Sequence, residues 1–201
     1  MKQVYIAIFA LTVSSVACQL SQLTATITPL ATNLGTEVVQ ITLDNTTMIY
    51  YEIGGLTADE LREEMNQFGP PDPNEGLRYD SLTDWYISWT WPGYGEVECD
   101  LSQAHVSYDI KVTVPRWHPS PKTNPALIDH WNRYMNNLAI HEQAHVDAII
   151  NHYLQVKDAI QGATCATAEP AAQEILDKLK QFQIEYDRQT KHGETQGAVF
   201  P

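Results

Sequence analysis

The chain has 201 residues, with 25 acidic against 12 Lys and Arg residues, a formal net charge of −13, and 43% hydrophobic residues. This length fits one globular domain, or two small ones at most, and can bury a sizeable core. So acidic a chain lacks a basic stripe that would neutralise phosphates, which argues against nucleic acid as a partner. Its longest apolar run is too short to cross a bilayer, which argues against an integral membrane protein.

The N-terminus has the pattern of a signal peptide over residues 1–17, with an apolar stretch and then small residues before Cys18. Cleavage there suits an ordinary signal peptidase. The same residues resemble a lipobox in which Cys18 would be lipidated, although Ser15 stands where Leu is usual. We expect an exported protein, either secreted or in the periplasm or outer membrane of a Gram-negative bacterium as a lipoprotein, touching membrane only through Cys18. Residues 18–36 predict a tether to a domain over 37–201.

Three cysteines leave one over unless Cys18 is processed separately. The other two, Cys99 and Cys165, are then expected to form a disulfide across a long loop, as an oxidising compartment permits. The alternative is that both are free, buried thiols.

The domain is expected to begin with residues 38–43 and 47–53, two runs rich in β-branched and aromatic side chains that predict a hairpin. Later, residues 85–91 and 106–114 alternate apolar and polar side chains at period two, which predicts two long strands. The second should end at Pro115. We expect about four strands in a small, mostly antiparallel sheet, with the tryptophans of 85–91 in its core.

A short helix is predicted between these two pairs of strands. Thr57 with Glu60 three residues later forms a capping-box signature at its start. Leu61, Met65 and Phe68 then fall on one helical face, and a Gly-Pro pair ends the helix.

From Pro125 the spacing becomes helical and continues to about Ile160, and a second helical pattern runs from Ala171 to about Thr190. Between them lies a segment rich in Gly, Thr and Pro. The C-terminal half is therefore predicted to be a long helical hairpin, and the fold class to be α+β.

His141, Glu142 and His145 form an HExxH motif on the first of these helices. Two histidines four residues apart project from one face, so both can bind one Zn²⁺ while Glu142 reaches a water on the metal. The spacing predicts a zinc hydrolase with Glu142 as general base. The alternative is two ordinary histidines on a polar helix face, with Glu142 in solvent.

A catalytic zinc usually has three protein ligands. His152, on the same helix, is out of step with the motif. Antiparallel pairing of the two helices instead brings residues 185–193 opposite it. We choose His192 as the third ligand, ahead of Asp187 and Glu185. If His192 binds the metal, Asp187 would accept a hydrogen bond from an imidazole N–H.

Four blocks carry a family resemblance, and in chain order they are GGLTADELREEMNQFGP, DWYISWTW, HEQAH and YDRQTKHG. Together they resemble a bacterial family of secreted zinc-dependent proteases, a domain of unknown function. The resemblance covers about Tyr50 to Gly193. It implies a zincin-type metallopeptidase with Zn²⁺ as cofactor and a peptide or protein as substrate.

We therefore expect an exported metallopeptidase. The alternative is a non-catalytic, zinc-stabilised envelope lipoprotein that binds a partner through its acidic surface, and the intact Glu142 favours the enzyme. Hydrolysis of cell-wall peptide cross-links would use the same chemistry and differ only in substrate.

Overall fold

A computed structural model describes residues 26–31, 37–71 and 76–201 of the chain. The predicted signal peptide, residues 1–17, and Cys18 lie outside the described residues. None of the described helices has a sufficiently long apolar stretch to span a lipid bilayer.

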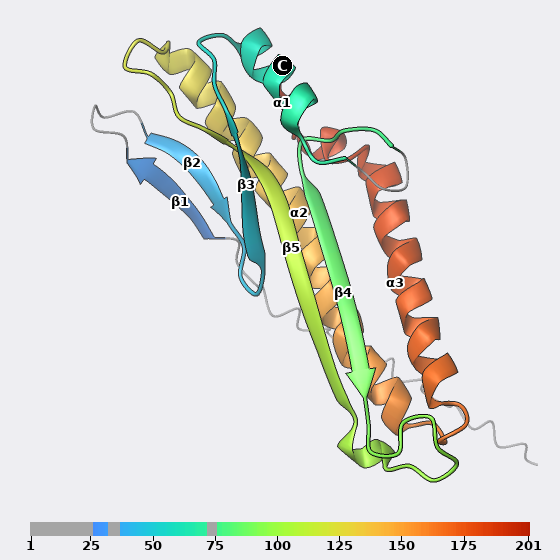
Figure 1. The fold of residues 1–201 in the computed structure, drawn as a ribbon. Coiled ribbons are helices and arrows are strands. Elements are labelled where there is room, and N and C mark those ends of the chain that lie inside the picture. Colours follow the sequence, from blue (N-terminus) through green and yellow to red (C-terminus); the bar gives the residue numbers. More distant parts are fainter. Residues whose placement is uncertain (1–25, 32–36, 72–75) are drawn as a thin grey trace, which may run out of the picture.

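Three strands form the central sheet, in the order β3-β5-β4. Strand β5 (His105–Trp117) pairs in parallel with β3 (Thr47–Ile53) and antiparallel with β4 (Leu82–Thr90) (Figure 1). Strand β5 continues two residues beyond Pro115, where we expected it to end. Pairing with β4 stops at Thr113, so among the described strands β3 alone pairs with β5 at the proline, and the missing N–H is tolerated there.

The described residues also form three α-helices: α1 (Ala58–Phe68), α2 (Pro125–Gln161) and α3 (Ala168–Thr190). The long α2 packs along the sheet, and α3 runs back beside it near the β4 edge (Figure 1). The predicted α+β fold and its C-terminal helical hairpin are confirmed. The core lies between sheet and helix, where Val112 of β5 and Leu138 of α2 are both buried.

The predicted hairpin between the first two β-rich runs is wrong. Strand β2 (Glu37–Thr42) pairs antiparallel with β1 (Thr26–Ala31) in a separate two-stranded sheet, whereas the second run becomes β3 and joins β5. Strand β2 also packs on α2, where the Val39 N–H donates to the Asn132 side chain over 2.8 Å. Strand β1 lies within the segment expected to be a tether. The central sheet has three strands rather than about four, and it is mixed rather than mostly antiparallel.

The predicted capping box of α1 is present, since the Thr57 hydroxyl accepts from the Glu60 N–H and the Glu60 carboxylate accepts from the Thr57 N–H. Leu61 and Met65 are fully buried. Phe68, the last residue of the helix, is half exposed, so the packed face is narrower than predicted.

The aromatic face of β4 is only partly core. Ile87 and, just after the strand, Trp91 are buried as expected, whereas Trp85 and Trp89 are partly exposed. Trp89 Nε1 donates to the Glu169 carboxylate over 2.8 Å, and Trp85 lines a cavity between β4 and α3.

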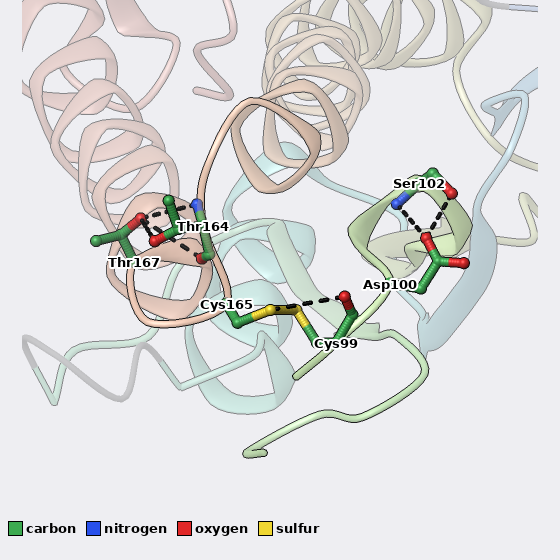
Figure 2. Close-up of a disulfide and its surroundings, with 6 residues drawn as sticks. All are labelled: Cys99, Asp100, Ser102, Thr164, Cys165 and Thr167. Atoms are coloured by element: carbon green, nitrogen blue, oxygen red, sulfur yellow. Dashed lines mark hydrogen bonds between the residues drawn. A yellow bond between two sulfur atoms is a disulfide. The ribbon is translucent and has the colours of Figure 1, made fainter. Parts of the chain in front are cut away.

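The predicted disulfide is present, with the Cα atoms of Cys99 and Cys165 5.7 Å apart (Figure 2). It ties the loop that follows β4 to the turn between α2 and α3. Trp89 and Tyr94 add two hydrogen bonds to Glu169 in the first turn of α3. This end of α3 is therefore fastened to the sheet.

Candidate metal centre

The two histidines of the HExxH motif face α3 from a buried stretch of α2. His141 and His145 are 3% and 6% exposed, and their Nε2 atoms lie 3.3 Å apart. Helix α3 brings Asp187 onto them, with Oδ1 3.3 Å from His141 Nε2 and 3.0 Å from His145 Nε2. One ligand atom from each residue therefore lies within 4.8 Å of the other two.

Each imidazole has its other nitrogen held by a glutamine. His141 Nδ1 lies 2.9 Å from Gln196 Oε1, and His145 Nδ1 contacts Gln183 Oε1. Gln183 Nε2 donates to the carbonyl oxygen of His145, so its Oε1 is left to accept from the ring. A proton on Nδ1 leaves the Nε2 lone pair free. With both rings in this tautomer, two imidazole lone pairs and a carboxylate oxygen converge, an arrangement that either a proton on Nε2 or a metal ion would stabilise.

The pKa values of Asp187 and His145 also favour a positive charge between these side chains. Burial raises the pKa of Asp187, but hydrogen bonds from His141 and His145 outweigh it and hold that pKa well below its usual value. Burial lowers the pKa of His145, but the Asp187 hydrogen bond and the Glu142 charge outweigh it and raise that pKa above its usual value. A proton or a metal ion can supply the charge.

Of the candidates for the third ligand, Asp187 lies with the two histidines. His192, the residue that we chose from the sequence, is not part of this group and lies next to Asp187 instead. His192 Nδ1 lies 3.8 Å from Asp187 Oδ1, and its ring stacks on Tyr79 with centroids 4.2 Å apart. Helix α3 ends at Thr190, and Lys191 and His192 both adopt left-handed backbone angles (φ 51° and 53°). The chain therefore leaves the helix before His192, whereas Asp187 still lies on it.

The other two candidates lie outside the cluster. Glu185 is exposed and pairs with Arg188, whose hydrogen bonds lower the pKa of Glu185 to about 2. His152 uses Nδ1 to contact the Ala148 carbonyl oxygen over 2.8 Å on its own helix.

Glu142 is 2% exposed and is held by two hydroxyls, one from the residue just before β4 and one from the start of that strand. Ser81 Oγ donates to its Oε1 and Thr83 Oγ1 to its Oε2, each over 2.5 Å. Residues two apart in an extended chain point to the same side, so both hydroxyls reach one carboxylate. The sequence did not reveal Ser81 and Thr83 as partners of Glu142, because no motif links side chains that are 61 and 59 positions apart in the chain.

Tyr186 supports both imidazoles. Its ring stacks on His141 with centroids 5.2 Å apart and meets His145 edge-on at 4.9 Å. Its hydroxyl accepts from Gln196 Nε2 over 2.9 Å. Sequence reasoning also missed Gln183 and Gln196. Gln183 could have been found, since it precedes Asp187 by one helical turn and must share its face.

The cluster opens into a cavity of about 820 Å³ between β4 and α3. The side chains of Glu142 and the three clustered residues reach it. Leu82 and Trp85 of β4 form part of one wall, and Ile184 of α3 part of another.

Residues 48–193 match the family described as "Bacterial protein of unknown function (DUF922)". The match runs from β3 to just beyond α3 and includes every residue of the cluster. It covers the same region as the resemblance seen from Tyr50 to Gly193. No curated protein and no solved structure matches the chain.

Proposed function

This chain belongs to the bacterial family DUF922, and we propose that it is a zinc metallopeptidase. The observation that carries the proposal is the convergence of His141, His145 and Asp187 beside the buried Glu142. Two imidazoles and one carboxylate are a ligand set used by catalytic zinc, and three protein ligands leave room for water and substrate.

The surroundings of the cluster support a metal ion. Histidines that bind a metal generally donate their second N–H to an acceptor, as Gln196 and Gln183 allow here. All three ligand atoms come from two packed helices, which hold them together without a rearrangement.

The proposed reaction assigns Glu142 the proton transfers. A bound zinc ion would activate water and polarise the carbonyl of the peptide bond. Glu142 would accept the proton of that water and deliver it to the leaving amine. Ser81 and Thr83 would hold the carboxylate in place. Tyr186 is assigned none of these steps, since its hydroxyl accepts from Gln196 Nε2 and also donates to Gln196 Oε1 over 3.3 Å.

Strand β4 offers a place for the substrate. It is an edge strand of the described sheet, and Leu82, Thr83 and Trp85 line the cavity. An extended peptide can add to such an edge through main-chain hydrogen bonds. The substrate would then run past Glu142, whose carboxylate is bonded to the same strand.

One observation favours the alternative of a zinc-stabilised binding module. Both oxygens of Glu142 are hydrogen bonded to hydroxyls, as suits a purely structural carboxylate. Glu142→Gln separates the two functions, since an enzyme loses turnover whereas a binding module keeps its partner.

The first test is zinc content per chain, with folding checked by circular dichroism. We expect about one zinc in the wild type, Glu142→Gln and His192→Ala, and its loss in His141→Ala and Asp187→Ala. The second test is cleavage of a mixed peptide library by the wild type, with Glu142→Gln as the blank. A folded wild type that binds no added zinc, or a Glu142→Gln variant that cleaves as fast, would refute the proposal.

A further inference from the structure

The charge of the cavity wall differs from that of the whole chain. The chain carries a net charge of −13 and only 12 Lys and Arg residues, yet four of these line the cavity. Three carboxylates line it with them, and two of these belong to the proposed metal and base machinery. The four basic residues are Arg62, Arg78, Arg188 and Lys191.

Two of the four are already bound to carboxylates of the chain. Arg62 makes two hydrogen bonds to Asp80, of 2.6 and 3.0 Å, and also donates to the carbonyl oxygen of Phe200. Arg188 makes two to Glu185, of 2.7 and 2.6 Å. These two residues have structural partners and little charge left for a ligand.

The charges of the other two basic residues, Arg78 and Lys191, remain available to a ligand. Arg78 is exposed and donates over 2.5 Å to the carbonyl oxygen of Gly69, which is uncharged. Lys191 lies 3.6 Å from Glu194, and both side chains are more than half exposed, so this pair is weak. Within the described residues, neither cation has a carboxylate oxygen within 3.5 Å.

Arg78 and Lys191 are each next in sequence to one of two aromatic residues that stack on each other. Tyr79 follows Arg78, His192 follows Lys191, and the two aromatic rings stack with centroids 4.2 Å apart. This stack joins the segment before β4 to the end of α3. His192 Nδ1 in turn lies 3.8 Å from Asp187 Oδ1, so this part of the cavity wall adjoins the proposed metal ligands.

We propose that this basic wall, made by Arg78 and Lys191, binds a carboxylate of the peptide substrate. The enzyme would then prefer peptides with an acidic side chain or a free C-terminal carboxylate near the bond that is cut. Cations in a cleft concentrate anionic ligands, and both side chains donate charge-assisted hydrogen bonds to carboxylates. This inference rests on the proposed function for its substrate, but its charge preference can be measured without turnover.

The binding test uses zinc-loaded Glu142→Gln full-length chain and three fluorescent peptides of one neutral sequence. The first has an amidated C-terminus, the second a free one, and the third is amidated with one internal Glu. We expect about tenfold tighter binding of at least one carboxylate peptide than of the neutral peptide. Which of the two binds more tightly identifies the source of the carboxylate.

The preference should vanish when Arg78→Gln and Lys191→Gln are added together. Arg133→Gln and Lys180→Gln are matched controls, because these exposed basic residues do not line the cavity and should leave the preference intact. Equal binding of the three peptides, binding of none, or a preference that survives the double substitution would overturn the inference.

Cleavage of a proteome-derived peptide mixture separates this inference from the proposed function. The wild type should cut next to acidic residues or free C-termini, and the double substitution should raise KM about tenfold with little change in kcat. Cleavage without such a preference overturns the basic wall and leaves the peptidase. Carboxylate-dependent binding without any cleavage supports the wall and counts against the peptidase.

Discussion

Thr83 and Glu142 are joined by a hydrogen bond of 2.5 Å, although 59 residues separate them in the sequence. Thr83 belongs to the edge strand β4, and Glu142 lies on α2 beside the proposed metal ligands. The orientation of the proposed base is therefore set by the strand along which we expect the substrate to lie. Ser81 makes the matching bond to the other carboxylate oxygen.

Replacing Thr83 with Val should impair both stability and turnover. Val keeps the volume but removes a donor from a buried carboxylate, which should lower the free energy of unfolding by about 1–3 kcal/mol. If Glu142 is the base, kcat should fall about tenfold with KM little changed, because Thr83 orients the base. Thr90→Val, at the exposed far end of the same strand, is the control. Urea unfolding and peptidase kinetics measure the two effects, and an unchanged kcat would remove Thr83 from the proposed mechanism.

Gln183→Leu should weaken zinc binding by about 10–100-fold, the usual effect of losing the partner of a metal-bound histidine. The substitution removes the acceptor for His145 Nδ1 and leaves the three ligands in place. Gln181→Leu is the matched control, since Gln181 is exposed two residues earlier on the same helix. Competition with a fluorescent chelator gives the affinities. Equal values for the two variants would show that Gln183 does not support the site.

Removing the disulfide by Cys99→Ser with Cys165→Ser should destabilise the protein. The bond closes a loop with a sequence separation of 66 residues, and loop-closure entropy predicts a loss of about 4 kcal/mol. Guanidinium unfolding of the double variant against the wild type measures it. Adding a reducing agent should lower the midpoint of the wild type alone. A wild type indifferent to the reducing agent would show that the disulfide contributes little.

The buried hydroxyl of Tyr134 should make the protein less stable at alkaline pH. Its hydroxyl is buried and donates to Asp80 over 2.7 Å, and burial raises its pKa well above the usual value near 10. Above pH 10 the unfolded chain releases this proton and the folded chain keeps it. Stability should therefore fall by up to about 1.4 kcal/mol per pH unit for this group.

Tyr134→Phe tests this assignment. The variant should be less stable at pH 8 by about 1–2 kcal/mol, because Asp80 loses a donor. It should also lose less stability than the wild type between pH 8 and 11, as measured by urea unfolding. An equal alkaline loss in both proteins would mean that other groups cause it.

The helices and long strands could be predicted because their signals are local. The capping box of Thr57 and Glu60 acts over three residues, and the alternation along β4 and β5 reflects neighbours within one strand. The HExxH spacing likewise places His141 and His145 on one face of a helix, whatever surrounds it.

The partners of these elements could not be predicted in the same way. The runs that became β2 and β3 are close in sequence and suited to a hairpin, but β2 packs on α2 and β3 pairs with β5. The choice among strand partners depends on packing across the whole domain. For the same reason, the sequence predicts that Trp85 lies in the core, whereas in the structure it lies in the wall of the cavity.

The sequence by itself determined the HExxH pair, the helical hairpin and a short segment opposite the motif in which a further ligand should lie. Only the tertiary structure decided that Asp187 rather than His192 lies with the histidines, because α3 ends at Thr190 and the chain turns away there. It also brought Ser81 and Thr83 to Glu142. Local spacing determines what one helix can present, whereas contacts between distant segments exist only once the chain has packed.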